Sequence, residues 1–231
     1  MRRSVLSVVC AGVLAMSVSV GPAAGAEQQP DRCPTPDPPA GFTALWDGHT
    51  LHGWQMAGYG SFVVTENCTL MSRGSGGLLW YTREAFGDFH LKLQYRTNNP
   101  TDNSGVFMRF PAPWNWDGAW SAQPDDSVRG YEAQIEDNPG GGDPQKTGSI
   151  YNFATITDLL AKPTGTWNTY EVKAVGQTYT VILNGQVVNT YTGDGSRALA
   201  GHLGFQNHHD GSDVEFRNVW IASLDSGCPG H

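Results

Sequence analysis

The chain has little cysteine, few charged residues and none of the short motifs that mark several common catalytic folds. Only four of its 231 residues are cysteine, and no Cys-x-x-Cys pair or cysteine and histidine cluster has the spacing of a zinc site. The Gly-x-Ser-x-Gly pattern of a nucleophile elbow is missing. The three glycines at 140–142 do not follow a strand and open a helix, so they do not indicate a phosphate cradle.

Basic residues are also scarce. The chain has 14 lysine and arginine residues against 22 aspartate and glutamate residues, which gives a formal net charge of −8. Residues 1–26 carry two of the basic residues and none of the acidic ones, so the chain without them carries −10. Nucleic acid and anionic membranes are therefore poor partners for this protein.

The single long apolar run lies at the N-terminus. Arg2 and Arg3 precede an apolar stretch over 5–20, and Ala24-Gly25-Ala26 offers a cleavage site with small residues. Serine and glycine residues interrupt the stretch and polar sequence follows it, so residues 1–26 are predicted to be a cleaved secretory signal and not a membrane anchor. The mature protein is expected to be secreted and extracellular.

The remaining chain is predicted to hold one domain. Five prolines in 27–40 favour an extended linker, the domain is expected over 41–225, and 226–231 form a tail. About 200 residues suffice for a single core.

Three cysteines remain after the signal: Cys33, Cys68 and Cys228. In an oxidising compartment they can form one disulfide, and the third thiol is left over or pairs with another chain. A Cys33–Cys228 bridge that ties the two ends of the domain is the first expectation, and Cys33–Cys68 is the competitor. The oligomeric state stays open.

Short apolar or alternating runs, separated by turn residues, follow one another from residue 42 onward, and only 156–161 could form a helical turn. This pattern predicts an all-β fold, a two-sheet antiparallel jelly-roll sandwich of the concanavalin A-like kind. The expected strands are 42–46, 62–65, 69–72, 78–82, 89–97, 105–110, 130–137, 149–153, 168–175, 178–183, 186–192, 202–207 and 214–224.

The most informative run is Gly-Tyr-Glu-Ala-Gln-Ile-Glu-Asp at 130–137. On a strand, Glu132, Gln134 and Glu136 line one face about 7 Å apart, opposite an apolar face. Three hydrogen-bonding groups in a row suit a sugar. A strand with one solvated face is the alternative interpretation.

Two further strands carry polar candidates. Asn103 and Arg109 share a parity in 103–109, and an arginine there can hold sugar oxygens or simply pair with a carboxylate. Gln206 and His208 share a parity in 202–209, and a histidine can exchange a proton near neutral pH. The loop 210–213 offers oxygen ligands for a divalent cation but lacks calcium-loop spacing, so no cofactor is expected.

Ten motifs in order, spanning 41–224, resemble the bacterial 3-keto-disaccharide hydrolase family, also described as 3-keto-glucoside lyases and hydratases. They are Gly41-Phe-Thr-Ala-Leu-Trp-Asp-Gly48 with Leu51-His-Gly-Trp54, Gly87-Asp-Phe89, Asn103-Ser-Gly-Val-Phe-Met-Arg109, Tyr131-Glu-Ala-Gln-Ile-Glu-Asp137, Thr147-Gly-Ser-Ile-Tyr151, Gly165-Thr-Trp-Asn-Thr-Tyr-Glu171, Leu183-Asn-Gly185, Gly204-Phe-Gln206 and Phe216-Arg-Asn-Val219.

The resemblance implies a concave sheet face that accepts an oxidised disaccharide or oligosaccharide with a carbonyl at carbon 3. A base removes the C2 proton, the glycosidic oxygen leaves by elimination, and water then adds back. The catalytic candidates are Glu132, Asp137, Arg109 and His208, with Glu132 or Asp137 as the proton-transfer group and Arg109 steadying negative charge. The substrate-binding candidates are Asn103, Gln134, Glu136, Tyr151, Gln206 and Trp116.

This chain departs from the family pattern at Glu136, where an apolar residue is usual, so the register of the catalytic acid is open. The aromatic segment 111–120 is interpreted as a lid, a sugar platform or simple loop packing.

Two other functions compete with the lyase and hydrolase reading. A laminarinase-like retaining endoglucanase would use the carboxylates of a Glu-x-Asp-x-Glu strand, but Gln134 occupies the middle position. A lectin-like module that binds carbohydrate without cleaving it would share the fold.

Overall fold

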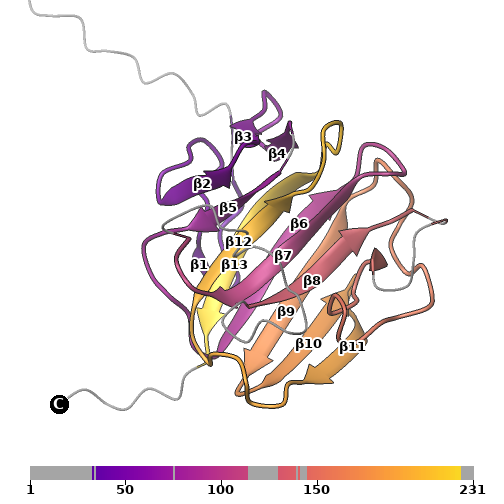
Figure 1. The fold of residues 1–231 in the computed structure, drawn as a ribbon. Coiled ribbons are helices and arrows are strands. Elements are labelled where there is room, and N and C mark those ends of the chain that lie inside the picture. The colour runs from indigo at the N-terminus through magenta and orange to yellow at the C-terminus, as the bar shows by residue number, and fades with distance from the viewer. Residues whose placement is uncertain are drawn as a thin grey trace, which may run out of the picture. The chain divides into compact units, whose positions relative to one another are not determined.

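The computed structural model describes residue 33 and residues 35–74, 76–113, 130–138, 140 and 145–224. Within these residues the secondary structure is all β, in two antiparallel sheets, which confirms the predicted fold class (Figure 1). The predicted signal segment, half of the linker and the tail lie outside the described residues. No helix of the described part is long and apolar enough to cross a membrane.

The larger sheet has eight described strands in the order β11-β10-β9-β6-β13-β4-β3, with β1 paired to β13. Every pairing in it is antiparallel. Its strands are β1 (Thr43–Ala44), β3 (Ser61–Val64), β4 (Leu70–Arg73), β6 (Phe89–Arg96), β9 (Asn168–Val175), β10 (Thr178–Leu183), β11 (Gln186–Thr192) and β13 (Glu215–Ser223).

The smaller sheet has five described strands in the order β2-β5-β12-β7-β8. All of these pairings are antiparallel as well. Its strands are β2 (Trp54–Gly58), β5 (Gly77–Tyr81), β7 (Asn103–Phe110), β8 (Tyr131–Glu136) and β12 (His202–Asn207).

The core lies between the two sheets and follows from strand alternation. Along β6 every second residue is buried, from Phe89 to Tyr95, and the residues between them are half-buried. Apolar side chains of the smaller sheet, such as Val106 and Ile135, join the same cluster. Each large apolar side chain buried in this way contributes about 1.5–3 kcal/mol relative to exposure.

The hairpin from β10 to β11 turns at Asn184 and Gly185, as the sequence predicts. Both residues have positive φ, 51° and 84°, which asparagine and glycine tolerate and which the tight hairpin turn requires. The expected bounds of both strands agree with the structure.

Strands β7 and β8 differ from β6 because all of their residues are buried on both faces. On the outer face of the smaller sheet a second apolar cluster forms, separate from the core between the sheets. It consists of Ala57, Leu78, Trp80, Phe107 and Phe110, with Ala112 packed against it. This sheet therefore buries polar and apolar groups on the face that points away from the core.

Three sequence expectations about elements are wrong. β2 was not expected, because Trp-Gln-Met-Ala-Gly lacks a clear alternation. The expected strand 149–153 is only a bridged segment, in which Ile150 pairs with Ala133 and with Ala154. Residues 156–161 form no helical turn.

The disulfide joins Cys33 to Cys68, with the two Cα atoms 5.3 Å apart. The first expectation, Cys33–Cys228, is therefore wrong, and its competitor is confirmed. The turn between β3 and β4 presents Cys68 with a φ of 59°, which brings its side chain to the segment that precedes the domain. Cys228 lies outside the described residues.

Candidate functional site

The candidate site lies on the outer face of the smaller sheet, along β8. Tyr131, Ala133 and Ile135 enter the core between the sheets, so the alternate residues face outward. Glu132, Gln134 and Glu136 are nevertheless buried, with exposed fractions of 3%, 2% and 7%. A buried row of polar side chains is costly for folding unless it is satisfied, which makes it informative about function.

Glu132 is the least satisfied member of this row. It leans over the neighbouring strand, where a Cβ built on Gly105 would lie 2.0 Å from its Oε1 atom, so only glycine leaves room for the carboxyl group. Within the described part of the chain, that Oε1 atom has no hydrogen-bond partner. Burial raises the pKa of Glu132 well above its ordinary value.

Gln206 of β12 flanks the same glycine from the other side. Gly204 pairs with Phe107 and Phe205 with Val106, and this register continues to place Gln206 beside Gly105. The Oε1 atom of Gln206 is also buried without a hydrogen-bond partner in the described residues. This part of the outer face thus carries two buried acceptor oxygens, Oε1 of Glu132 and Oε1 of Gln206, that no donor among the described residues satisfies.

The remaining polar groups of the face form a short chain of hydrogen bonds. Gln134 Nε2 donates to Asn103 Oδ1 at 3.0 Å, and Asn103 Nδ2 donates to Glu136 Oε2 at 2.9 Å. Burial raises the pKa of Glu136, while the hydrogen bond from Asn103 opposes that rise. The chain holds the Gln134 side chain in one orientation beside Gly105, its partner across the β7–β8 pairing.

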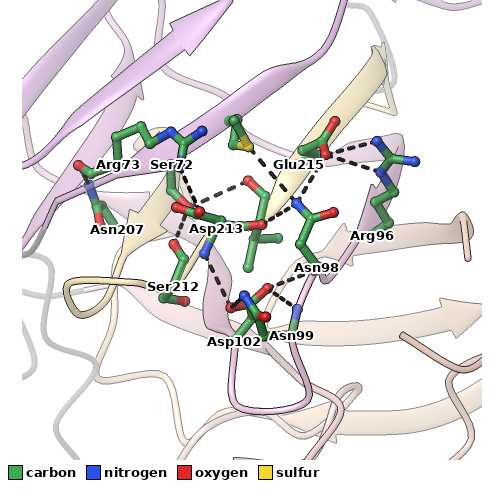
Figure 2. A network of polar contacts seen from close by, with 12 residues as sticks. Ser72, Arg73, Arg96, Asn98, Asn99, Asp102, Asn207, Ser212, Asp213 and Glu215 are labelled. Carbon is green, nitrogen blue, oxygen red and sulfur yellow. Dashed lines mark hydrogen bonds and ion pairs between the residues drawn. The ribbon is translucent and has the colours of Figure 1, made fainter. Parts of the chain in front are cut away.

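A larger polar network fixes the start of β7 (Figure 2). The backbone N–H of Asn103 donates to Ser212 Oγ at 2.7 Å, and Ser72 Oγ donates to the carbonyl of Ser212 at 2.7 Å. The Asp102 carboxylate accepts the backbone N–H groups of Asn98 at 2.6 Å and Asn99 at 2.8 Å. The network joins the β6–β7 loop to the β12–β13 connection and so positions Asn103.

Tyr151 lies at the edge of the site. Its backbone N–H donates to the carbonyl of Glu132 at 3.0 Å, and the bridge between Ala133 and Ile150 places Tyr151 next to Glu132 across the edge of β8. Tyr151 is half-buried. The structure therefore brings six predicted residues together: Asn103, Glu132, Gln134, Glu136, Tyr151 and Gln206.

Arg109 does not join them, and the expectation that it shares their face is wrong. The pairing of β7 with β12 shifts register at this point, where Leu203 pairs with Met108 and His202 with Phe110. Arg109 is the extra residue of a β-bulge, with a φ of 54°. A bulge reverses the alternation of side chains between the two faces. Residues beyond Met108 therefore do not lie on the faces that the sequence alternation predicts.

The Arg109 side chain is buried in a structural ion-pair network. Its Nη2 donates to Asp88 Oδ1 at 2.9 Å and to the carbonyl of Gly87 at 2.7 Å, and its Nη1 donates to the carbonyl of Gly176 and to Tyr179 Oη. These partners lie in the β5–β6 connection and around β10. This arrangement agrees with the alternative interpretation from the sequence, in which Arg109 forms an ion pair with a carboxylate.

Asp137 lies on the opposite face of the sheet from Glu132, as the alternation along 131–137 predicts. It continues the parity of Ile135, and its carboxylate accepts hydrogen bonds from Thr147 Oγ1 at 2.5 Å and from Tyr95 Oη of the larger sheet at 3.2 Å. Burial raises its pKa, and these hydrogen bonds oppose the rise. Asp137 is thus held on the inner side of the sheet and does not share the outer face with Glu132.

His208 lies just beyond the end of β12 and is exposed. Its Nδ1 lies 2.9 Å from the Nδ1 of His209, and burial of part of the ring lowers its pKa. Asp213, in the predicted cation loop, pairs with Arg73 at 2.6 Å. The described residues hold no cluster of three metal-ligating side chains. Trp116 lies outside the described residues.

The sequence reasoning missed His202 and Trp80 on the same face. His202 shares the parity of Gln206, and its Nδ1–H donates to the carbonyl of Tyr81 at 3.0 Å, so its Nε2 is not used in that bond. Trp80 meets its ring edge-on, with centroids 4.7 Å apart. The alternation along 202–206 places His202 on the same face as Gln206, so the sequence could have predicted this position.

The fold and this face define a two-sheet antiparallel sandwich of the kind found among carbohydrate-active and carbohydrate-binding domains. The family model of the 3-keto-alpha-glucoside-1,2-lyase-like domain matches residues 41–222. Because the match covers most of the chain, the protein belongs to this family, which confirms the resemblance found in its motifs.

Solved structures agree with this architecture. A candidate glycosyl hydrolase from Parabacteroides distasonis is 24% identical, with a TM-score of 0.65 over 80% of this chain and 94% of its own. A Bacillus subtilis protein with a galectin-like fold is 12% identical, with a TM-score of 0.54 over 75% and 90%. At these identities the likeness shows the fold alone. No curated protein matches the chain.

Proposed function

We propose that this protein cleaves 3-keto-glycosides by removing the C2 proton, eliminating the leaving group and adding water, with Glu132 as the proton-transfer group. The observation that carries the proposal is the Glu132 carboxyl group, which is buried, has a raised pKa and has one oxygen without a hydrogen-bond partner among the described residues. A general base works best when its pKa lies near the working pH. Burial moves the pKa of a glutamate in that direction.

The ketone at C3 acidifies the C2–H bond, Glu132 takes that proton, and the electron pair forms an enolate. The enolate then expels the glycosidic oxygen from C1, and this oxygen takes the proton that Glu132 holds and leaves as an alcohol. Water adds across the resulting C1–C2 double bond and gives the free 3-keto sugar.

The other residues of the face supply binding. The unpartnered oxygens of Glu132 and Gln206 are acceptors, and sugar hydroxyl groups are donors that match them. The amide N–H groups of Gln206, beside Gly105, are the donors we assign to the enolate oxygen, in place of Arg109. The hydrogen bonds that join Gln134, Asn103 and Glu136 fix the orientation of the Gln134 amide group.

The retaining endoglucanase is the weaker alternative. Glu132 and Glu136 are four residues apart on a regular strand, so their Cα atoms are about 13 Å apart. Retaining glycosidases place their two carboxyl groups about 5–5.5 Å apart. A lectin-like module remains the second candidate, because a buried polar face can bind a sugar without cleaving it.

Incubation of the protein with a 3-keto-disaccharide, an unmodified disaccharide and a β-glucan tests the proposal. Release of 3-keto-glucose from the first substrate alone is the expected result. Glu132→Gln should lower the rate about 10²- to 10⁴-fold, whereas Glu84→Gln, at an exposed glutamate, should not change it. Binding without release, or release from the glucan, overturns the proposal.

A further inference from the structure

The outer face of the larger sheet carries two arginine side chains against one tryptophan ring. Along β6 the residues that alternate with the core are polar and half-buried, and Gln94 and Arg96 are two of them. Strand β13 places Arg217 opposite Gln94, and Trp167 directly precedes β9. This face lies on the other side of the sandwich from Glu132, so it is separate from the candidate site.

Both guanidinium groups pack on the Trp167 ring. The Cζ atom of Arg217 lies 4.0 Å from the ring centroid, and the Cζ atom of Arg96 lies 4.9 Å from it. Two like charges this close repel each other, and a nearby negative charge offsets the repulsion. Burial, and after it the charge of Arg96, lower the pKa of Arg217, but an arginine stays protonated at neutral pH.

This pair of arginines has one carboxylate partner among the described residues. Glu215 Oε1 accepts hydrogen bonds from Arg96 Nε at 3.1 Å and from Arg96 Nη2 at 2.9 Å (Figure 2). Arg217 donates from Nε to Gln94 Oε1 at 2.8 Å, and its two Nη groups have no acceptor in the described part of the chain. With two cations and one carboxylate, the cluster has one positive charge in excess.

A small cavity adjoins Arg217 on the same face. Its volume is about 120 Å³, and its lining includes Gln94, Thr169, Asn218 and Trp220. A β-bulge in β13 opens this space, because the pairing with β6 passes from Arg217 opposite Gln94 to Trp220 opposite Lys92. Asn218, inside the bulge, has a φ of 53°.

The lining of the cavity suits hydroxyl groups. Gln94 Oε1 accepts Asn218 Nδ2 at 2.9 Å as well as Arg217 Nε, so the amide N–H groups of Gln94 remain as donors. The half-buried ring of Trp220 adds a flat apolar wall. At the far end of the cavity Lys92 pairs with Glu171 at 3.4 Å, so these two charges offset each other.

We infer that this face binds a hydroxylated carboxylic acid, with its carboxylate on the guanidinium group of Arg217 and its hydroxyl groups in the cavity. The planar fork of a guanidinium group matches a carboxylate. A carboxylate carries one negative charge, which equals the excess of the cluster. A dianion such as sulfate would exceed that charge and would also approach Glu215. The inference goes beyond the proposed function and does not depend on it.

Amide chemical shifts measured by NMR during titration with D-glucuronate, acetate and D-glucose test the inference. D-glucuronate combines a carboxylate with hydroxyl groups, whereas acetate lacks the hydroxyls and D-glucose lacks the charge. D-glucuronate should shift the resonances of β6, β9 and β13. Acetate should bind there about 3- to 10-fold more weakly, the effect of one or two lost hydrogen bonds, and D-glucose should not shift these strands.

Arg217→Gln should weaken D-glucuronate binding about 10- to 100-fold, the effect of losing hydrogen bonds from a charged group. Arg217→Lys keeps the charge without the fork and should recover only part of the affinity. Lys173→Gln is the matched control, because it removes one positive charge from the same face at a residue that does not line the cavity. It should change the affinity less than twofold.

Equal losses in Arg217→Gln and Lys173→Gln would show general charge attraction and overturn the inference. Equal affinity for sulfate and D-glucuronate, or shifts from D-glucose on these strands, would overturn it as well. If Arg217→Gln does not fold, the wild-type titrations decide, and the absence of D-glucuronate shifts on β6, β9 and β13 overturns the inference.

Discussion

Glu132 is deeply buried, and that burial makes folding depend on pH. Because burial raises its pKa, the native state keeps a proton that the unfolded chain releases as the pH rises above about 4.5. The contribution of Glu132 to stability is therefore complete at acid pH and is lost as the pH rises through the native pKa. Glu136 and Asp137 act in the same direction.

Glu132→Gln should therefore stabilise the unliganded protein while it removes activity. Glutamine has the same shape and no ionisation, so we expect a gain of about 1–3 kcal/mol at pH 8 and little difference at pH 4. Thermal unfolding of the two proteins across this pH range measures the stability difference, and each kcal/mol should shift the Tm by about 2–4 °C. A difference that does not grow with pH would contradict the raised pKa.

Gly105→Ala should disturb the site without any backbone strain, since Gly105 does not have a positive φ. The new Cβ would overlap the Glu132 carboxyl group, so we expect a loss of about 1–3 kcal/mol and of most activity. In a Glu132→Ala background the same change should cost much less. Urea unfolding of the four proteins gives this coupling energy.

Gly140→Ala is the control for Gly105→Ala. Among the described residues its Cβ would meet only Asn138 Oδ1, at 3.5 Å, so stability should stay within about 0.5 kcal/mol. A similar cost for Gly105→Ala in both backgrounds would show that Glu132 is not the group it displaces.

Strand β7 carries two different tasks along its length. Its first half supplies Asn103 and Gly105 to the outer face, and the bulge at Arg109 turns the chain inward to an ion pair with Asp88. Arg109→Met should cost about 1–3 kcal/mol, because it removes the buried donor of the Gly87 and Gly176 carbonyls and the ion pair with the partly exposed Asp88. The rate per folded molecule should stay unchanged, as measured by single-turnover kinetics after folding is quantified.

Arg73→Met provides the comparison for Arg109→Met. Arg73 is about half exposed and pairs with Asp213, so its loss should cost about 0–1 kcal/mol. If the folded Arg109→Met protein loses activity, Arg109 influences the reaction despite its position.

The sequence predicts regular strands well and irregular backbone poorly. The bounds of β9 to β12 agree with those expected from alternation and turn residues, because apolar periodicity determines which face is buried. The polar row on β8 follows from the same periodicity. Arg109 was misplaced because a bulge leaves no mark in that pattern.

The position of Asp137 relative to Glu132 followed from parity, yet its partners Tyr95 and Thr147 could not be predicted. Tyr95 belongs to the other sheet and Thr147 to an irregular segment, so only the three-dimensional fold brings them to Asp137. The same limit applies to a cavity of about 540 Å³ between Gln55 of β2 and Trp80 of β5, since β2 was not expected.

At the scale of the whole molecule, the Cys33–Cys68 bridge ties the chain that precedes the domain to the β3–β4 turn. It spans 35 residues of sequence, and a loop of this length contributes about 4 kcal/mol in the chain-entropy model. The double variant Cys33→Ser and Cys68→Ser should lose about this amount in urea unfolding.

Cys228→Ser should leave the stability unchanged, because Cys228 takes no part in the bridge. Peptide mapping without reduction should recover a peptide pair that contains Cys33 and Cys68. A pair that contains Cys33 and Cys228 would contradict the structure.

The bulge at Arg109 also constrains how the length of this protein can vary. Loss of Arg109 would restore simple alternation and leave Phe110 on the outer face, but it would remove the guanidinium group that pairs with Asp88. Insertions and deletions in related chains should therefore fall in the connections between strands, and the spacing from Asn103 to Phe110 should be kept.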